Sequence, residues 1–386
     1  MSGAAAPATM RVALPCTGLG RQRRGFEAFT RELHAVLRDA PGLALSVYGG
    51  GGDVRTGEHA VWNTPRDSSA ARTLAALSGR GPYFVEQATF FAGFLPHLLV
   101  TRPHLVYFAD LNLGNALWHW RRVTGQRFGL LFYNGGATTR PYTRCDWVQQ
   151  LTPAHFDEAV GRGEARDRMV VLPHGITLPA SLASRDPARV AATRRAVGAS
   201  DGVPLLLSVG MLDRTIKRMD ALVDAVAALG EGRPHLVMLG QETSETAVLR
   251  TQARAKLGER VWIGTWPAER MADAYEAADA FALFSLREGF GLAYVEALGA
   301  GLPCVAHDTP GTRHLFGEHA FLGDTQSPAV AVAELQRALA QPATGAQRTA
   351  RHAWVRAQFG WDALAPRYAE MLRAFAAGHR PAWGDA

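Results

Sequence analysis

The chain alternates short apolar segments with stretches of helical periodicity, and this alternation restarts near the middle of its 386 residues. Each apolar segment ends in glycine or polar residues, as the buried strands of a parallel sheet do. We predict strands in the first half at residues 12–15, 43–48, 104–108, 128–132 and 170–172. The second half repeats the pattern at residues 205–209, 235–239, 261–263, 280–284 and 305–306. Two such blocks predict two doubly wound α/β domains.

The length of the chain supports the same division, because roughly 150–200 residues suit each of two domains. A stretch rich in Pro, Ala and Ser at residues 178–187 is the expected linker. We predict a disordered leader over residues 1–9, a first domain over 10–180 and a second over 181–360. Apolar residues at helical spacing predict that 361–386 cross back onto the first domain as a helix. Ligands of such sheets bind at the carboxyl ends of the strands, so we expect a cleft between two facing domains.

The stretch with the clearest chemistry is Glu288-Gly289-Phe290-Gly291-Leu292, which precedes Glu296. A glycine-rich turn that opens a helix offers backbone N–H groups to an anion. Glu296 falls about one helical turn inside, where its carboxylate can accept hydrogen bonds from hydroxyl groups. A solvated helix start also explains two acids, and a surface position also explains Lys217. The glycine turn after a predicted strand favours a sugar-nucleotide site.

The landmarks of the chain together resemble those of retaining glycosyltransferases of the GT4-type group, also called glycosyl transferases group 1, which have the GT-B fold. The block from Glu288 to Glu296 is similar to the E-x7-E motif of that family. The resemblance implies two Rossmann-like domains, the first binding the acceptor and the second the nucleotide sugar, and the activity of a retaining hexosyltransferase. The other landmarks are Gly18-Leu19-Gly20, Pro173-His174-Gly175-Ile176, Ser208-Val209-Gly210 and Lys217-Arg218.

The resemblance also implies roles for individual residues. Lys217 and Arg218 would stabilise the leaving diphosphate, and Glu288 would lie at the transferred sugar; these three are the catalytic candidates. Glu296 would bind the donor ribose. The remaining donor-binding candidates are Gly18, Gly20, Gly210, Arg214, Phe290, Gly291 and Leu292.

The sequence departs from the family's pattern in both halves. Met211 stands where the family often has arginine, so Arg214 or Arg218 would supply the second cation beside Lys217. Residues 133–136 replace a region in which the family often has a histidine. Three residues near predicted strand ends are candidates for acceptor binding, although core or turn positions also explain them: Asp110, Asn134 and His174.

Transfer from a nucleotide sugar places negative charge on the diphosphate, which fixed cations and N–H dipoles stabilise. The sequence has no Asp-x-Asp triplet, which holds a metal in many nucleotide-sugar enzymes. We therefore expect a metal-independent enzyme without a cofactor, with a UDP- or GDP-linked sugar as co-substrate and an acceptor hydroxyl of unknown identity. Two alternatives stay open: a GT-B phosphorylase or synthase, and a catalytically inactive nucleotide- or glycan-binding relative. A dinucleotide oxidoreductase is a weaker one, because no acid is placed for its ribose.

Composition bounds the partners and the location of the protein. The formal net charge is +6 at pH 7, carried almost entirely by arginine. No nucleic-acid motif accompanies this charge, so we expect no nucleic-acid partner, whereas peripheral contact with an anionic inner membrane face is left open. Cys16, Cys145 and Cys304 show no disulfide or zinc spacing. No apolar run reaches the roughly 18 residues needed to span a bilayer, and we expect a cytoplasmic protein.

Overall fold

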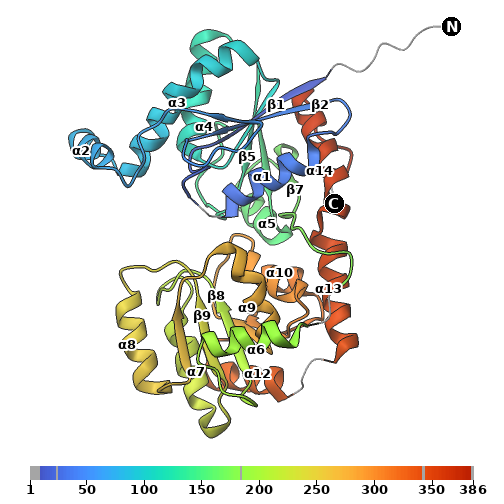
Figure 1. Ribbon diagram of the computed structural model, residues 1–386. Helices are drawn as coiled ribbons and strands as arrows, with labels where there is room; N and C mark the ends of the chain where they lie inside the picture. Colours follow the sequence, from blue (N-terminus) through green and yellow to red (C-terminus); the bar gives the residue numbers. More distant parts are fainter. Residues whose placement is uncertain (1–8, 23–24, 183–184, 341–343, 384–386) are drawn as a thin grey trace, which may run out of the picture. The chain divides into compact units, whose positions relative to one another are not determined.

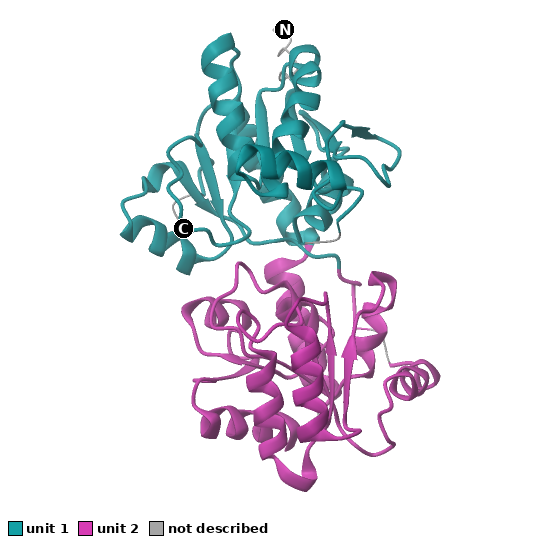
Figure 2. Ribbon diagram, turned by 90° about the vertical axis from the view of Figure 1, so that its left-hand side faces the viewer, with its two compact units in different colours: residues 1–177, 361–386 teal, residues 178–360 magenta. Residues whose placement is uncertain are grey.

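A computed structural model describes residues 9–22, 25–182, 185–340 and 344–383. The chain divides into two compact units, which Figure 2 colours separately. Unit 1 comprises residues 1–177 and 361–386, and unit 2 comprises residues 178–360. Of the leader predicted over residues 1–9, only Thr9 lies among the described residues.

Unit 1 is built on a seven-stranded sheet in which every strand pair is parallel, with the order β3-β2-β1-β4-β5-β6-β7. The direction of the strand order changes between β1 and β4, and such switch points are where doubly wound sheets bind ligands. The strands are β1 (Met10–Cys16), β2 (Leu43–Gly49), β3 (Glu58–Ala60), β4 (Leu105–Phe108), β5 (Gly129–Tyr133), β6 (Trp147–Gln150) and β7 (Met169–Val171). The helices are α1 (Gly25–Leu37), α2 (Ser69–Ser78), α3 (Pro82–Thr101), α4 (Leu111–Thr124), α5 (Pro153–Gly161) and α14 (Trp361–Ala376), with a 3-10 turn at Arg166–Arg168.

The C-terminal helix α14 packs in unit 1 against α1 and β1, as predicted (Figure 1). Its Tyr368 hydroxyl donates to the Pro173 carbonyl at 2.7 Å, just after β7. The Trp361 ring lies directly over Gly175, where a Cβ would come within 2.6 Å of the indole. The predicted turn at residues 173–176 therefore anchors α14. Position 175 requires glycine, because any side chain would collide with the Trp361 ring.

Unit 2 repeats the architecture with a six-stranded parallel sheet in the order β10-β9-β8-β11-β12-β13. Its switch point lies between β8 and β11. The strands are β8 (Leu205–Val209), β9 (His235–Leu239), β10 (Val261–Gly264), β11 (Ala280–Leu283), β12 (Cys304–His307) and β13 (Ala320–Gly323). The helices are α6 (Pro187–Ala196), α7 (Met219–Ala228), α8 (Thr246–Leu257), α9 (Met271–Ala277), α10 (Leu292–Gly299), α11 (Pro310–Phe316), α12 (Pro328–Ala340) and α13 (Gly345–Phe359), with 3-10 turns at Gly230–Gly232 and Ala268–Arg270.

The two-domain α/β prediction is confirmed, and three strands were absent from it. β3 is an exposed edge strand without an apolar run, and β13 is only partly buried. β6 carries Gln149 and Gln150, which look unlike core residues but are buried. In the core, Gln149 Nε2 donates to the Leu172 carbonyl at 2.6 Å and to the Tyr368 hydroxyl at 2.8 Å. Among the described residues, the structure contains no helix with both the length and the apolarity to cross a bilayer.

Candidate active site

The loops after β8 and β11 bring two predicted catalytic residues together at the switch point of unit 2. Lys217 Nζ lies 2.6 Å from Glu288 Oε1 and 2.8 Å from Oε2. Each side chain is only 17% exposed, so the ion pair is shielded from water on most sides. Partial burial strengthens such a pair and holds the ammonium group in one place.

The backbone around Lys217 is fixed by Asp213, which the sequence analysis did not single out. Asp213 is buried, and its Oδ1 accepts hydrogen bonds from the N–H groups of Ile216 and Lys217, both at 2.7 Å. An acid three or four residues before a lysine, after a strand-ending glycine, is the pattern of a side-chain-closed turn. That spacing could have identified Asp213 as the residue that positions the lysine.

Two glycines make room for the Lys217 side chain. The aliphatic part of Lys217 lies across Gly210, where a Cβ would be 3.2 Å from Lys217 Cγ. The carbonyl oxygen of Gly210 in turn lies against Gly240, where a Cβ would approach it to 1.6 Å. A larger residue at position 240 would displace the backbone at Gly210 or at Gly240 itself. Because Lys217 packs on Gly210, the two glycines together determine where the lysine side chain lies.

The glycine turn opens α10 as the sequence predicts. Gly291 is the N-cap residue with φ of 90°, a left-handed conformation that favours glycine, and it provides no side-chain cap. The first N–H groups of a helix lack intrahelical partners, so this end of α10 can bind an anion. Leu292 is the first helical residue, and the Phe290 ring is buried against Phe359 with ring centroids 5.5 Å apart.

Glu296 is partly buried in the second turn of α10. Its Oε2 accepts a hydrogen bond of 2.6 Å from the hydroxyl of Tyr275 on α9. Burial raises the pKa of Tyr275 well above its ordinary value, so the phenol stays a donor. Tyr275 therefore orients the carboxylate predicted to bind ribose, and no feature of the sequence near it indicated this contact.

The two arginines predicted to supply the second cation lie in different surroundings. Arg218 has a left-handed backbone with φ of 51° and directs its guanidinium toward the Phe284 carbonyl at 3.4 Å, at the end of β11. Arg214 is exposed and pairs with Asp220 at 3.4 Å in the first turn of α7. Arg218 therefore contacts the end of a switch-point strand, whereas Arg214 does not. Its left-handed backbone is a second indication, because strained non-glycine residues are common at functional sites.

In unit 1, the switch point between β1 and β4 carries Asp110, the residue before α4. Asp110 is the N-cap residue of α4, but its side chain makes no capping hydrogen bond. Its Oδ2 accepts a hydrogen bond from the Thr17 hydroxyl at 3.0 Å, and its Oδ1 accepts one from the hydroxyl of Tyr83 on α3. Thr17 follows β1 directly, so two strand ends and one helix hold this carboxylate.

A cavity of about 330 Å³ opens beside Asp110 in unit 1. Asn134 lines it too, but the Asn134 side chain is committed to structure, because it donates to Tyr142 and Gln150 and accepts from the Thr138 N–H. The lining also includes Tyr83, Gln87, Thr138 and Arg140.

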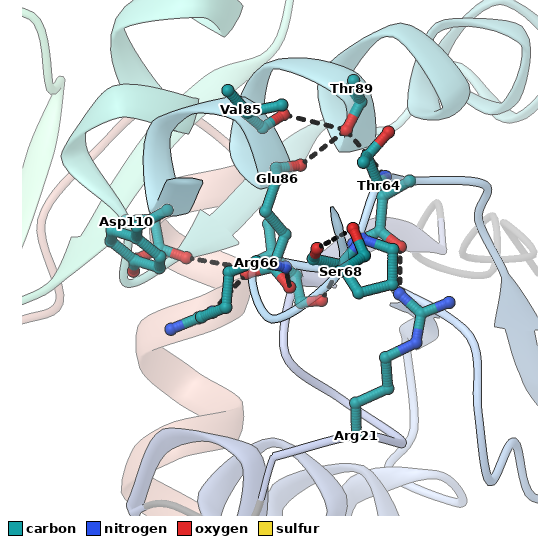
Figure 3. Close-up of polar contacts among 12 residues, drawn as sticks. Arg21, Thr64, Arg66, Ser68, Val85, Glu86, Thr89 and Asp110 are labelled. Atoms are coloured by element: carbon teal, nitrogen blue, oxygen red, sulfur yellow. Dashed lines mark hydrogen bonds and ion pairs between the residues drawn. The ribbon is translucent and has the colours of Figure 1, made fainter. Parts of the chain in front are cut away.

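The first two turns of α3 beside this cavity are held by hydrogen bonds from the loop between β3 and α2 (Figure 3). Arg66 donates from its Nε to Glu86 Oε2 at 2.6 Å, and Thr64 N–H donates to the Thr89 hydroxyl at 2.9 Å. The guanidinium of Arg66 also lies over the Tyr83 ring, 4.3 Å from its centroid. The helix that carries Tyr83 and Gln87 is therefore held rigidly at the cavity wall.

The other predicted residues of unit 1 lie in structural positions. His174 is buried and bonded to the Tyr133 hydroxyl at 2.6 Å, and burial lowers its pKa to about 3. It does not line the cavity. Gly18 accepts the N–H groups of the following turn, and a Cβ on Gly20 would come within 2.3 Å of the Gly51 carbonyl. The first glycine loop is thus packed against the loop after β2.

Within the part of the chain that the structure describes, no three His, Cys, Asp or Glu residues gather as a metal site. The three cysteines are buried and form no disulfide with one another. Burial raises the pKa of the Cys145 thiol to about 12.

Residues 190–357 match the family model described as Glycosyl transferases group 1, a segment that lies inside unit 2. A D-inositol 3-phosphate glycosyltransferase of Nocardia farcinica is 36% identical over 159 residues, which make up 39% of this chain and 34% of that protein. A mannosylfructose-phosphate synthase of Agrobacterium fabrum is 31% identical over 201 residues, or 47% of this chain and 42% of that protein. The chain thus spans between a third and a half of the length of these curated relatives.

Solved structures match almost the whole chain. Sucrose-phosphate synthase from Thermosynechococcus elongatus superposes with a TM-score of 0.75 at 21% identity, covering 95% of this chain and 99% of that one. Anabaena HepE in complex with UDP and glucose gives a TM-score of 0.72 at 17% identity, covering 94% and 99%. The chain therefore has the GT-B fold, and its residues 190–357 match the glycosyl transferases group 1 domain.

Proposed function

We propose that this protein transfers a sugar from a nucleoside diphosphate to an acceptor hydroxyl, with retention and without a metal ion. The observation that carries the proposal is the shielded Lys217–Glu288 pair at the switch point of unit 2. Glu288 lies in the loop that leads into α10, whose N-terminus has no side-chain cap and whose second turn carries Glu296. A cation, open N–H groups and two carboxylates are what a diphosphate with neighbouring hydroxyl groups requires.

The proposed chemistry assigns separate roles to the two members of the pair. Cleavage of the anomeric C–O bond leaves negative charge on the diphosphate, which Lys217 and the α10 N-terminus would stabilise without reorganising. The Lys217 ammonium can share its donors between the diphosphate and Glu288, and the Glu288 carboxylate is then available to hydroxyl groups of the sugar. Glu296 would accept hydrogen bonds from the ribose. The family supports retention, with a diphosphate oxygen helping to deprotonate the acceptor.

Unit 1 supplies the proposed acceptor site. The cavity beside Asp110 is at the small end of the size range of small-molecule sites. The names of the relatives above contain small phosphorylated polyols or sugars, which supports an acceptor of that size. The Asp110 carboxylate, already oriented by Thr17 and Tyr83, would accept a hydrogen bond from an acceptor hydroxyl.

A thermal-shift panel of UDP, GDP, ADP, UDP-glucose and GDP-mannose tests the donor class. A ligand at about 100 times its dissociation constant stabilises the folded protein by roughly 2.7 kcal/mol. Release of nucleoside diphosphate with acceptor supports transfer. Use of a sugar 1-phosphate instead would identify a phosphorylase or synthase, and binding without turnover would identify an inactive relative. Failure of every nucleotide to stabilise the protein would contradict the proposal.

A further inference from the structure

Gln87 has an unusual position in the wall of the unit 1 cavity. Its side chain is 2% exposed, and neither Nε2 nor Oε1 has a hydrogen-bond partner among the described residues. A carboxamide has two N–H donors and two acceptor lone pairs. Leaving them unsatisfied in a buried place destabilises the fold, because the amide loses its hydrogen bonds to water and gains none in return. Such a group in a folded protein requires an explanation, and a ligand or water in the adjoining cavity provides one.

The surroundings of Gln87 separate it from an ordinary packing position. Tyr83 lies one turn earlier on α3, so the two side chains share a helix face. Tyr83 already donates to Asp110, which lines the same cavity. The neighbouring Glu86 is fixed by Arg66, so α3 cannot turn to give Gln87 another partner without breaking that pair. The amide of Gln87 is therefore carried by a helix that is fixed in place. It lines the same cavity as Asp110, whose carboxylate is already oriented by Thr17 and Tyr83.

We propose that Gln87 determines the specificity for the acceptor by binding two adjacent hydroxyl groups. Its Nε2 donates to one hydroxyl oxygen and its Oε1 accepts from the neighbouring hydroxyl, while Asp110 accepts from a further hydroxyl. The acceptor is then a polyol with a vicinal diol rather than a simple alcohol. A site built to hydrogen-bond a substrate hydroxyl rejects analogues that lack it, because the amide is left unpaired. This inference rests on the proposed function, in which unit 1 binds the acceptor.

The experiment compares wild type with Gln87→Met, which keeps the length of the side chain and removes the amide. Ligand-observed NMR titrations use myo-inositol as a ring with adjacent hydroxyl groups and cyclohexanol as a similar ring with one. We expect Gln87→Met to bind myo-inositol about tenfold more weakly, because two hydrogen bonds of ordinary strength are lost. Cyclohexanol should bind the two proteins equally. The melting temperature of the ligand-free variant should match or exceed that of wild type, since an unsatisfied amide is gone.

Gln336→Met, at an exposed position on α12, is the matched control and should leave both titrations unchanged. Gln87→Asn, which shortens the reach of the amide, provides a second variant if the methionine protein does not fold, and should also weaken myo-inositol binding. Equal myo-inositol affinities in wild type and the Gln87 variants, or no binding to wild type, would overturn the inference. A UDP and GDP thermal shift on the same proteins reports on unit 2 alone. If nucleotides stabilise the protein but the Gln87 substitutions do not change myo-inositol binding, this inference is refuted and the proposed donor function stands. If the substitutions weaken myo-inositol binding but no nucleotide stabilises the protein, the proposed donor function is refuted and the polyol site stands.

Discussion

Lys217 and Lys256 are the two lysines of the chain, and both form ion pairs in unit 2. Lys217 lies over Gly210 and is 17% exposed, whereas Lys256 is exposed on α8 and contacts Asp224. We predict that Lys217→Ala lowers turnover with a nucleotide sugar by on the order of 10²-fold or more, because a fixed charge at the leaving group is lost. The measurement is the rate of nucleoside diphosphate release.

Lys256→Ala is the control for this comparison, since it removes the same charge from an exposed surface pair, which contributes little to stability. Its turnover should equal that of wild type. Unchanged turnover in Lys217→Ala would show that the lysine has no role at the leaving group.

His174 leads to a prediction about acid stability. Burial lowers its folded-state pKa to about 3, while the unfolded chain takes up a proton below about 6.5. The unfolded state therefore binds more protons between these values, and folding stability is lost as the pH falls through that window. Between pH 7 and pH 5, this one residue lowers the free energy of unfolding by about 2 kcal/mol.

We predict that His174→Asn reduces the difference in unfolding free energy between pH 7 and pH 5 by about this amount, whatever its effect at pH 7. Urea denaturation at the two pH values measures it. His119→Asn on the exposed face of α4 should keep the wild-type difference. The same pH dependence in His174→Asn and wild type would mean that His174 is not held neutral.

Among the secondary-structure elements, the ends of β8 and β9 position the proposed donor site through a contact between two backbone segments. Gly240 allows the Gly210 carbonyl to approach it, and Gly210 supports Lys217. We predict that Gly240→Ala displaces the Gly210 segment, lowers stability by about 1–3 kcal/mol and weakens nucleotide binding measured by calorimetry.

Gly232→Ala is the matched control, because a Cβ there meets no atom within 4 Å and the backbone is not left-handed. It should bind nucleotide like wild type. If Gly240→Ala bound nucleotide as tightly as Gly232→Ala, the contact between the strand ends would not position the site.

The sequence predicts those helices and strands whose buried residues are apolar, because apolar residues then recur with the period of a strand or a helix. The strands at the two switch points are largely apolar runs, and α14 has apolar residues at helical spacing. β6 was missed because Gln149 is buried through hydrogen bonds to partners distant in the sequence, among them Tyr368. Gln87 was missed for a related reason: it lies inside a helix, and only the tertiary fold places its amide beside a strand end.

At the scale of the whole molecule, the two units carry different amounts of sequence information. The family match lies in unit 2, which contains the glycine turn, Lys217 and Glu296. The first unit shares the architecture, but its candidate acceptor residues come from strand ends and a helix that no common motif links. The proposed donor site can therefore be predicted from a motif, whereas the proposed acceptor site has to be inferred from the contacts of the folded chain.

In the proposed function, unit 2 binds a nucleoside diphosphate between Lys217 and the first turn of α10. The most direct measurement is a crystal structure of the full chain soaked with UDP and, separately, GDP. We expect the diphosphate within hydrogen-bond distance of Lys217 Nζ and of the N–H groups at Gly291 and Leu292, with the ribose at Glu296. A nucleotide bound elsewhere, with the Lys217–Glu288 pair unchanged and the α10 turn empty, would contradict it.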